Sequence, residues 1–290
     1  MICYTCSKDV VKPNIINFPD GTFKIDLFDD TKNICYLEFK DADKIQIYWK
    51  YENESELPQL IYITQGLRNI APMAKVFLFM PYIPNARMDR THSDSEVFTL
   101  KYFCDIINYL KYDSVFVLDA HSSVSTALLN NCRNISPKQL IEFVKNDINF
   151  NNKSDCIFFP DEGSCKRYSP MLTDCKNICF GIKHRDWSSG KIENLEIHGV
   201  DVDDKNVLII DDICSYGGTA YYSALELKKC GCKNINIFFT HTEDSINKGK
   251  LIDLLNDNTI EHIYTTDSLY SKGSSARITA IDIFDFMLLS

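Results

Sequence analysis

The sequence predicts an α/β protein of two domains, each a mainly parallel sheet flanked by helices. Two observations lead to this fold class. Short apolar runs alternate with amphipathic helical segments over most of the chain, and apolar strands between such helices are typical of parallel sheets covered on both faces. The length of 290 residues, with 45% apolar side chains, is enough for two domains with substantial cores.

Each element follows from local composition and spacing. The N-terminal segment favours strands because it is rich in β-branched and aromatic residues, whereas the apolar spacing becomes helical from Leu57 onward. The predicted strands are Thr22–Leu27, Ile34–Phe39, Ile45–Trp49, Val76–Met80, Val115–Leu118, Ile157–Phe159, Ile178–Ile182, Val207–Ile210, Ile235–Phe239 and Ile260–Tyr264. The predicted helices are Leu57–Ile70, Glu96–Leu110, Pro137–Lys145, Thr219–Lys229 and Asn247–Leu255.

A faint internal repeat supports two related domains. The apolar run leading into Asp119-Ala-His-Ser-Ser resembles the run leading into Asp211-Asp-Ile-Cys-Ser. Ligands of open α/β sheets bind beyond the carboxyl ends of the strands, so the two loops indicate sites that face one cleft. A boundary within Asn130–Pro137 gives predicted domains at 1–135 and 136–290.

Composition argues against several function classes. The net charge of −9 argues against a nucleic-acid partner. The N-terminal segment lacks a signal-peptide pattern, and apolar runs such as Val76–Met80 are too short to span a bilayer. The 12 cysteines are irregularly spaced, and no second pair completes a zinc site with Cys3 and Cys6. We therefore expect free thiols and a cytoplasmic protein.

The strongest signal for chemistry is a pair of carboxylates after an apolar strand, followed by a Gly-Gly-Thr turn that opens a helix. Backbone N–H groups at a helix start bind anions, and glycines let a phosphate approach closely. The carboxylates suit ribose hydroxyls or hydrated magnesium. The structural alternative, an Asp pair that caps the turn, is less specific than this combination. The segment comprises Asp211, Asp212, Ser215, Tyr216, Gly217, Gly218 and Thr219.

This segment resembles the phosphoribosyl-pyrophosphate motif shared by phosphoribosyltransferases and ribose-phosphate diphosphokinases. Further motifs, in family order from about Phe18 to Ile281, resemble the second family. On the nucleotide side, the resemblance implies an adenine loop from a neighbouring subunit, an ATP-site segment and a metal-binding Asp-x-His. The matching segments are Phe18-Pro-Asp20-Gly21, Pro81-Tyr-Ile-Pro-Asn-Ala-Arg87-Met-Asp89-Arg90 and Asp119-Ala-His121.

On the sugar-phosphate side, the resemblance implies a Pro-Asp-x-Gly loop, a catalytic Lys-x-Arg and landmarks near the end of the chain. Lys183 and Arg185 precede a polar stretch, Asp186–Lys191, that is typical of a mobile loop. The family's loop closes over the transferring group, where two cations stabilise developing charge. The matching segments are Phe159-Pro-Asp161-Glu-Gly163-Ser-Cys-Lys166-Arg167, Lys183-His-Arg185, Thr240-His241 and Thr265-Thr-Asp267.

The resemblance implies transfer of the diphosphate of ATP to the C1 hydroxyl of a ribose 5-phosphate group, with Mg²⁺ as cofactor and a homo-oligomer as the active form. Lys183 and Arg185 are then catalytic. The implied ATP-binding residues are Phe18, Asp20, Arg87, Asp89, Arg90 and His121. The implied metal ligands are His121 and Asp161, and Asp161 joins the sugar-phosphate segment in binding the ribose phosphate.

Departures from the family pattern leave the acceptor open. Ser215-Tyr216 replaces the family's Asp-Thr at the start of the phosphate loop, and Thr22 replaces an acidic residue of the adenine loop. Tyr216 offers an aromatic face, so the acceptor is either ribose 5-phosphate or a substituted form such as ADP-ribose. A phosphoribosyltransferase and a non-catalytic regulatory relative are more distant alternatives. The first would not need Arg87, His121 and Asp161, and the second would lose Lys183, Arg185 or His121.

Overall fold

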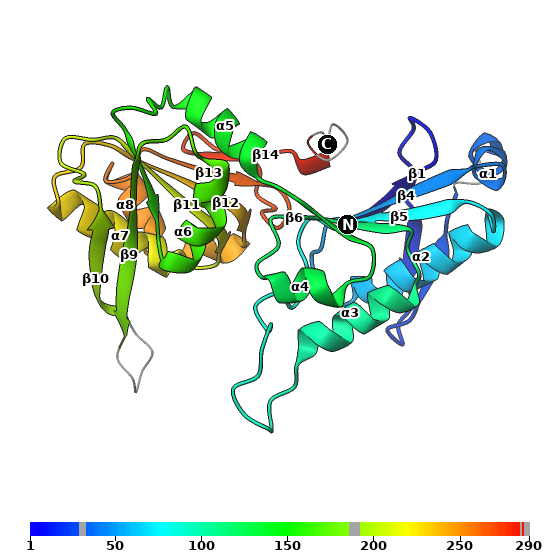
Figure 1. The fold of residues 1–290 in the computed structure, drawn as a ribbon. Helices are drawn as coiled ribbons and strands as arrows, with labels where there is room; N and C mark the ends of the chain where they lie inside the picture. Colours follow the sequence, from blue (N-terminus) through cyan, green and yellow to red (C-terminus); the bar gives the residue numbers. More distant parts are fainter. Residues whose placement is uncertain (29–32, 186–191, 285, 287–290) are drawn as a thin grey trace. The chain divides into compact units, whose positions relative to one another are not determined.

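The structure is a computed structural model that describes residues 1–28, 33–185, 192–284 and 286, without the side chains of 33–35, 183–185 and 192–194. The chain divides into two compact units, Met1–Ile135 and Ser136–Leu289. Each unit is an α/β layer structure around its own sheet (Figure 1). The α/β class predicted from the sequence is confirmed.

The first unit contains a five-stranded sheet in the order β1-β4-β5-β6-β7. Strands β4 to β7 are parallel, and β1 pairs antiparallel with β4 at one edge. A separate hairpin of β2 and β3 follows β1 in the chain. The strands are β1 (Ile2–Thr5), β2 (Asn14–Asn17), β3 (Phe23–Asp26), β4 (Lys44–Trp49), β5 (Lys75–Phe79), β6 (Ser114–Leu118) and β7 (Cys132–Ile135).

Helices α2 (Glu56–Ile70) and α3 (Thr99–Tyr109) run along one side of this sheet (Figure 1). Each buries an apolar stripe at helical spacing, which is the pattern of a helix that covers a sheet. The shorter helices of this unit are α1 (Asn33–Lys40) and α4 (Ser123–Leu128). The fully buried stripe residues are Leu60, Ile63, Leu67, Leu100 and Ile107.

The second unit contains a seven-stranded sheet in the order β10-β9-β8-β11-β12-β13-β14. Its strands are parallel except for β10, which pairs antiparallel with β9. The strands are β8 (Cys156–Phe159), β9 (Asn177–Arg185), β10 (Ile192–Gly199), β11 (Val207–Cys214), β12 (Ile235–Thr242), β13 (His262–Thr266) and β14 (Ile278–Ile281). The helices are α5 (Lys138–Asp147), α6 (Glu162–Tyr168), η1 (Ser169–Met171), α7 (Gly218–Lys229), η2 (Asp244–Lys248) and α8 (Leu251–Asn256).

Two sequence-based predictions of elements are wrong. Ile34–Phe39 was expected to be a strand and lies in α1, where Phe39 is buried against Tyr4 while Leu37 is exposed. Packing of one face here overrides the β propensity of the composition. The single helix expected at Asn247–Leu255 is instead divided between η2 and α8 around Gly249.

The described cysteines are free thiols, as expected. Burial raises the pKa of Cys104 to about 12 and that of Cys132 to about 11, so both stay protonated at neutral pH. In the part of the chain that the structure covers, no helix is long and apolar enough to cross a membrane.

Candidate functional site

The carboxyl ends of three neighbouring parallel strands gather polar residues at one edge of the second unit's sheet. Strands β8, β11 and β12 are adjacent and run in the same direction. Asp161 follows β8, the Asp211–Thr219 segment spans the end of β11, and Glu243 follows β12. The structure therefore brings together segments that are far apart in the sequence, at the edge where parallel α/β sheets bind ligands.

The turn between β11 and α7 has the geometry of an anion cradle. Gly217 is the N-cap of α7 with φ of 75°, a left-handed conformation that favours glycine. A Cβ at Gly217 would collide with the side chain of Leu251, whereas one at Gly218 would meet only open space. The first backbone N–H groups of the 12-residue helix α7 lack intrahelical partners and can therefore hold an anion there.

The two adjacent carboxylates of the segment have different environments. Asp211 is half-buried, and its Oδ1 accepts a bond from the Asp212 backbone N–H at 3.1 Å. Asp212 is buried, and its Oδ2 accepts from Nη1 of Arg167 in α6 at 2.9 Å. Asp211 is therefore the carboxylate better exposed to a ligand, while Asp212 is paired with a cation inside the unit.

Asp161 caps helix α6. Its Oδ1 accepts from the backbone N–H and the hydroxyl of Ser164, at 2.9 and 3.0 Å, and the Asp161 N–H donates to the same hydroxyl. This capping box fixes the carboxylate at the start of the helix.

The start of the loop between β11 and α7 is hydrogen-bonded to the segment after β12. The hydroxyl of Ser215 donates to Oε2 of Glu243 at 2.7 Å, and the hydroxyl of Ser245 donates to the same oxygen at 3.2 Å. The backbone N–H of Glu243 donates to the Cys214 carbonyl at 2.8 Å. Beside this cluster the Tyr216 side chain is 60% exposed.

Lys183 and Arg185 lie at the end of β9, which is parallel to β8, so their backbones reach the same sheet edge as Asp161. Lys183 pairs with Leu195 and Arg185 with Ile192 of β10. Their side chains, and the whole Asp186–Lys191 stretch expected to be a mobile loop, lie outside the described part of the chain.

In the first unit, the segment predicted to bind ATP follows the carboxyl end of β5. Its proline-rich beginning is buried in the core, and the Pro81 carbonyl accepts from the Leu118 N–H at 2.9 Å. Arg87 and Arg90 are exposed, and Arg90 lies 3.9 Å from Asp89. A buried base therefore leads into the two exposed arginines and the half-buried Asp89.

His121 follows the neighbouring strand β6. Asp119, at the strand end, is buried with φ of 44°, an uncommon backbone conformation for a residue with a side chain. The Ala120 N–H donates to the side chain of Asn134 at 3.0 Å, which fixes the turn. His121 is half-buried and follows β6, the strand beside β5, so its backbone lies at the same sheet edge as the segment predicted to bind ATP.

The expected adenine loop is the tip of the β2–β3 hairpin. Phe18 is 47% exposed there, and Gly21 has φ of 85°. The hydroxyl of Thr22 and its backbone N–H donate to Asp20 and hold the pKa of that carboxyl below its ordinary value. The residue that replaces the family's acidic one therefore helps to orient Asp20 within the tip.

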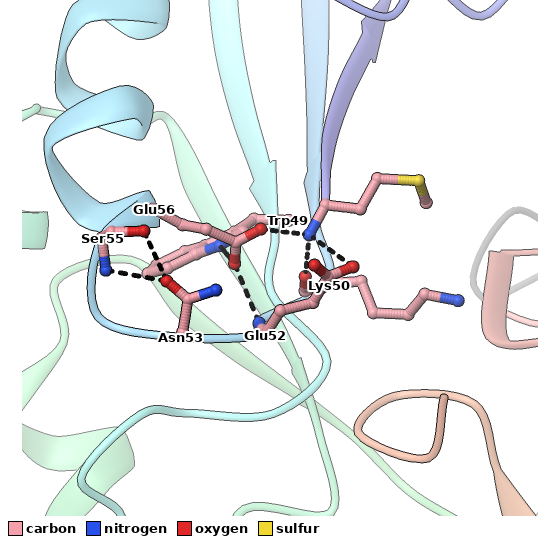
Figure 2. Close-up of polar contacts among 7 residues, drawn as sticks. Trp49, Lys50, Glu52, Asn53, Ser55 and Glu56 are labelled. Atoms are coloured by element: carbon pink, nitrogen blue, oxygen red, sulfur yellow. Dashed lines mark hydrogen bonds and ion pairs between the residues drawn. The ribbon is translucent and has the colours of Figure 1, made fainter. Parts of the chain in front are cut away.

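In the first unit, a buried carboxylate lies just beyond the carboxyl end of β4. Oε2 of Glu56 accepts from the Trp49 indole at 3.0 Å and from the Glu52 backbone N–H at 2.8 Å, as Figure 2 shows. The Met1 amino group also contacts this carboxylate. Glu56 thus satisfies one buried donor, the Trp49 indole, and two part-buried donors between β4 and α2.

Sequence reasoning did not assign roles to Arg167, Glu243 or Ser245. Arg167 lies 45 residues from its partner Asp212, and Glu243 lies 28 residues from Ser215. Only strand order reveals these pairs. A cation in the last turn of α6, six residues after Asp161, was the available signal for Arg167.

Among the described residues, no group of three or more His, Cys, Asp or Glu side chains is arranged to hold a metal ion. Mg²⁺ usually keeps several waters and takes only one or two protein carboxylates together with substrate phosphates. The carboxylates of Asp161 and Asp211, both half-buried, fit that way of binding.

Comparison with known proteins gives sequence and structural relatives. No family model matches the chain. A ribose-phosphate pyrophosphokinase of Thermococcus kodakarensis is 27% identical over 238 residues, covering 80% of this chain and 78% of that protein. One of Pyrococcus abyssi is 27% identical over 240 residues, with coverage of 80% and 77%. A phosphoribosylpyrophosphate synthetase structure from Mycobacterium smegmatis has a TM-score of 0.75 at 16% identity, covering 96% of this chain and 88% of that one.

The resemblance identified in the motifs is therefore confirmed, and the structural match agrees with the fold. The chain is a divergent relative of the ribose-phosphate pyrophosphokinases, and the prediction of an enzyme of that class is confirmed.

Proposed function

We propose that the protein transfers the β,γ-diphosphate of ATP to the anomeric hydroxyl of a ribose 5-phosphate group. The anomeric oxygen forms a bond to the β-phosphorus, and the bond from that phosphorus to the oxygen bridging the α-phosphate breaks. The hydroxyl proton is lost to solvent. The products are a 1-diphosphorylated sugar, AMP and a proton. The observation that supports this proposal is the anion cradle at Gly217–Thr219 beside Asp211, in a chain that is related to this enzyme class.

The second unit supplies the sugar-phosphate side in this proposal. Backbone N–H groups at Gly218 and Thr219 hold the 5-phosphate, and Asp211 binds ribose hydroxyls. Asp212 stays in its ion pair with Arg167 and helps to hold Asp211 in position. The remaining loop residues of the proposed site are Asp161, Ser215, Tyr216 and Gly217.

Lys183 and Arg185 are the proposed catalytic residues. In the transition state, negative charge is spread over the oxygens of the transferring β-phosphoryl group. Cations that point at those oxygens lower the activation barrier of the transfer. Their position at the end of β9, at the edge where Asp161 also lies, supports this role.

The nucleotide side belongs to the first unit. Arg87 and Arg90 bind triphosphate oxygens, Asp89 orients Arg90, and His121 contacts the phosphates. The exposed hairpin tip with Phe18 and Asp20 binds adenine in a neighbouring copy, so we expect at least a dimer. Sedimentation of the purified protein measures the assembly state, and a fully active monomer would contradict this expectation.

Mg²⁺, when bound, polarises the β-phosphoryl group and neutralises charge on the nucleotide. We propose that Asp161 and His121 are metal ligands, each in its own unit. The carboxylate of Asp161 is held in place by its capping box, which suits it to orient a hydrated ion.

Two acceptors fit the loop. Ribose 5-phosphate is the substrate implied by the relatives' names. The same chemistry on ADP-ribose, giving ADP-ribose 1-diphosphate, is supported by Tyr216, an exposed residue whose ring can stack on a base attached through the 5-phosphate.

The test is incubation with ATP, Mg²⁺ and either acceptor, followed by mass analysis of products. We expect AMP and a 1-diphosphorylated sugar, and no product after chelation of the metal. Stoichiometric ADP would indicate simple phosphoryl transfer and contradict the mechanism. A phosphoribosyltransferase would form no AMP from ATP and a sugar phosphate, and neither would a non-catalytic relative.

A further inference from the structure

Two landmarks of the sequence, Thr240-His241 and Thr265-Thr-Asp267, have no role in the proposed reaction, yet the structure joins them. Thr240 and His241 lie near the end of strand β12, and Thr266 ends the neighbouring strand β13. The hydroxyl oxygen of Thr266 lies 2.6 Å from the Thr240 carbonyl oxygen and 2.8 Å from the hydroxyl oxygen of Ser268. The Ser268 hydroxyl oxygen lies 2.7 Å from Nδ1 of His241. These four residues are buried.

The chemistry of these groups allows one direction for the hydrogen bonds. A carbonyl oxygen only accepts, and a hydroxyl has a single proton to donate. Thr266 therefore donates its proton to the Thr240 carbonyl, so the bond between Thr266 and Ser268 uses the Ser268 proton. His241 must then donate from Nδ1 to Ser268. This chain of hydrogen bonds, the His241 relay, runs from the imidazole to the Thr240 carbonyl and places a proton on Nδ1.

The His241 relay ends at an irregular point of strand β12. Phe238 pairs with Tyr264 of β13 and His241 pairs with Thr266, so β12 has one residue more than β13 between these two pairs. Such a bulge bends a strand and is common next to active sites. The carbonyl that the relay holds, that of Thr240, lies within the bulge. The relay therefore fixes the course of β12 near its carboxyl end.

The segment that follows β12 packs directly behind the anion cradle. A Cβ at Gly249 would collide with the Tyr216 carbonyl, and a Cβ at Gly217 would collide with the side chain of Leu251. Close-packed interiors transmit displacements from one element to the next. A shift at the end of β12 would therefore move the backbone and the side chain that support the cradle.

We propose that His241 and Thr266 are positioning residues of the sugar-phosphate site, which act through the bulge of β12 on the anion cradle at Gly217–Thr219. The inference rests on the proposed function of that site. Loss of the His241 relay should weaken binding of the sugar phosphate and leave binding of ATP unchanged, because the proposed ATP site belongs to the other unit. The two landmarks of the sequence then have one common role.

The first test measures which nitrogen of His241 carries a proton, by nitrogen NMR of the imidazole rings. The signals of His241 are those that disappear in His241→Asn. We expect a proton on Nδ1 in the wild type. Ser268→Ala removes the acceptor of that proton and should shift the neutral ring toward the form protonated on Nε2. A wild type with an unprotonated Nδ1 would overturn the relay.

The second test measures the Kd of the sugar phosphate and the Kd of ATP separately by calorimetry with Mg²⁺. The sugar phosphate is ribose 5-phosphate or ADP-ribose, whichever the wild type binds more tightly. Thr266→Val removes the hydroxyl at nearly the same size, and it should weaken sugar-phosphate binding roughly 10- to 100-fold, the scale of effect of a displaced binding group. Thr266→Ser keeps the hydroxyl and should bind like the wild type.

Thr64→Val is the matched control. It removes an equally buried hydroxyl, which lies 2.7 Å from that of Tyr112 in the first unit, and should leave the Kd of the sugar phosphate unchanged. Urea unfolding checks that each variant is folded in the assay. If Thr266→Val does not fold, Ser268→Ala breaks the same relay and takes its place.

Normal sugar-phosphate binding by the relay variants, or an equal loss in Thr64→Val, would overturn the positioning role. A wild type that binds neither sugar phosphate would refute the proposed site and the positioning role with it. If the Kd values change as expected while no acceptor yields AMP, the positioning role stands and the transfer reaction is wrong.

Discussion

Arg167 and Asp212 form an ion pair of 2.9 Å between Nη1 and Oδ2, which joins helix α6 to the end of strand β11. The side chain of Asp212 is only 8% exposed, and that of Arg167 is 29% exposed. The carboxylate next to the proposed ribose ligand Asp211 is thus held in place and neutralised from within the unit.

Removing Arg167 should therefore destabilise the second unit. We expect Arg167→Met to lower the free energy of unfolding by roughly 3–5 kcal/mol, because it leaves a buried charge without its cation. Adding Asp212→Asn should recover part of the loss. The control is Lys166→Met, whose surface pair with Glu162 contributes at most about 1 kcal/mol. Urea unfolding measures all four proteins, and equal losses at positions 166 and 167 would contradict the prediction.

Turnover should depend on the cations at the end of β9. We expect Lys183→Ala and Arg185→Ala each to lower kcat roughly 100- to 1,000-fold, the usual cost of removing a group that stabilises transition-state charge. The assay is AMP formation from ATP. Lys229→Ala removes an exposed cation at the far end of α7 and should keep normal turnover. Near-normal rates in both strand variants would place catalysis elsewhere.

Acceptor preference should change when the family-like pair is restored at the loop. If Tyr216 stacks on a base, Ser215→Asp with Tyr216→Thr should shift preference toward ribose 5-phosphate, because stacking contributes about 1–3 kcal/mol per base. The measured quantity is the ratio of kcat/KM for ADP-ribose and ribose 5-phosphate. The control is Tyr222→Thr, which changes a different exposed tyrosine that lies within α7. An unchanged ratio would leave ribose 5-phosphate as the preferred acceptor.

The buried carboxylate of Glu56 should stabilise the first unit. Glu56→Ala leaves the buried Trp49 indole without its acceptor, at roughly 1–3 kcal/mol for a buried group left unsatisfied, and it also removes the acceptor of the part-buried Glu52 N–H. Fluorescence of Trp49, in a Trp187→Phe background that makes it the sole tryptophan, follows the unfolding. Glu54→Ala, on the exposed side of the same turn, should change little. Equal free energies of unfolding for the two variants would contradict this prediction.

The fold was predictable where a strand is buried on both faces, because such a strand is apolar along its whole length. Val207–Ile210 is wholly apolar because β11 lies at the centre of its sheet, and the Gly-Gly-Thr turn identifies the start of α7. Composition predicted the wrong element at Ile34–Phe39. The packing of one helical face there overrides the strand propensity of the residues.

The site was only partly predictable for a different reason. The residues of one loop, such as Asp211 and Thr219, are neighbours in the chain, so their chemistry is visible in the sequence. Glu243 reaches Ser215 only because β12 lies beside β11, and that adjacency depends on strand order. Pairings across strands therefore remained hidden until the topology was known.

The close approach of Gly249 to the Tyr216 carbonyl constrains how this enzyme could be redesigned. A side chain at position 249 would collide with backbone, whereas the ring at position 216 projects into solvent. Libraries that seek new acceptors should therefore randomise position 216 freely and leave 249 as glycine. Tolerance to substitution and influence on the ligand would then coincide at position 216, which is a favourable starting point for directed evolution.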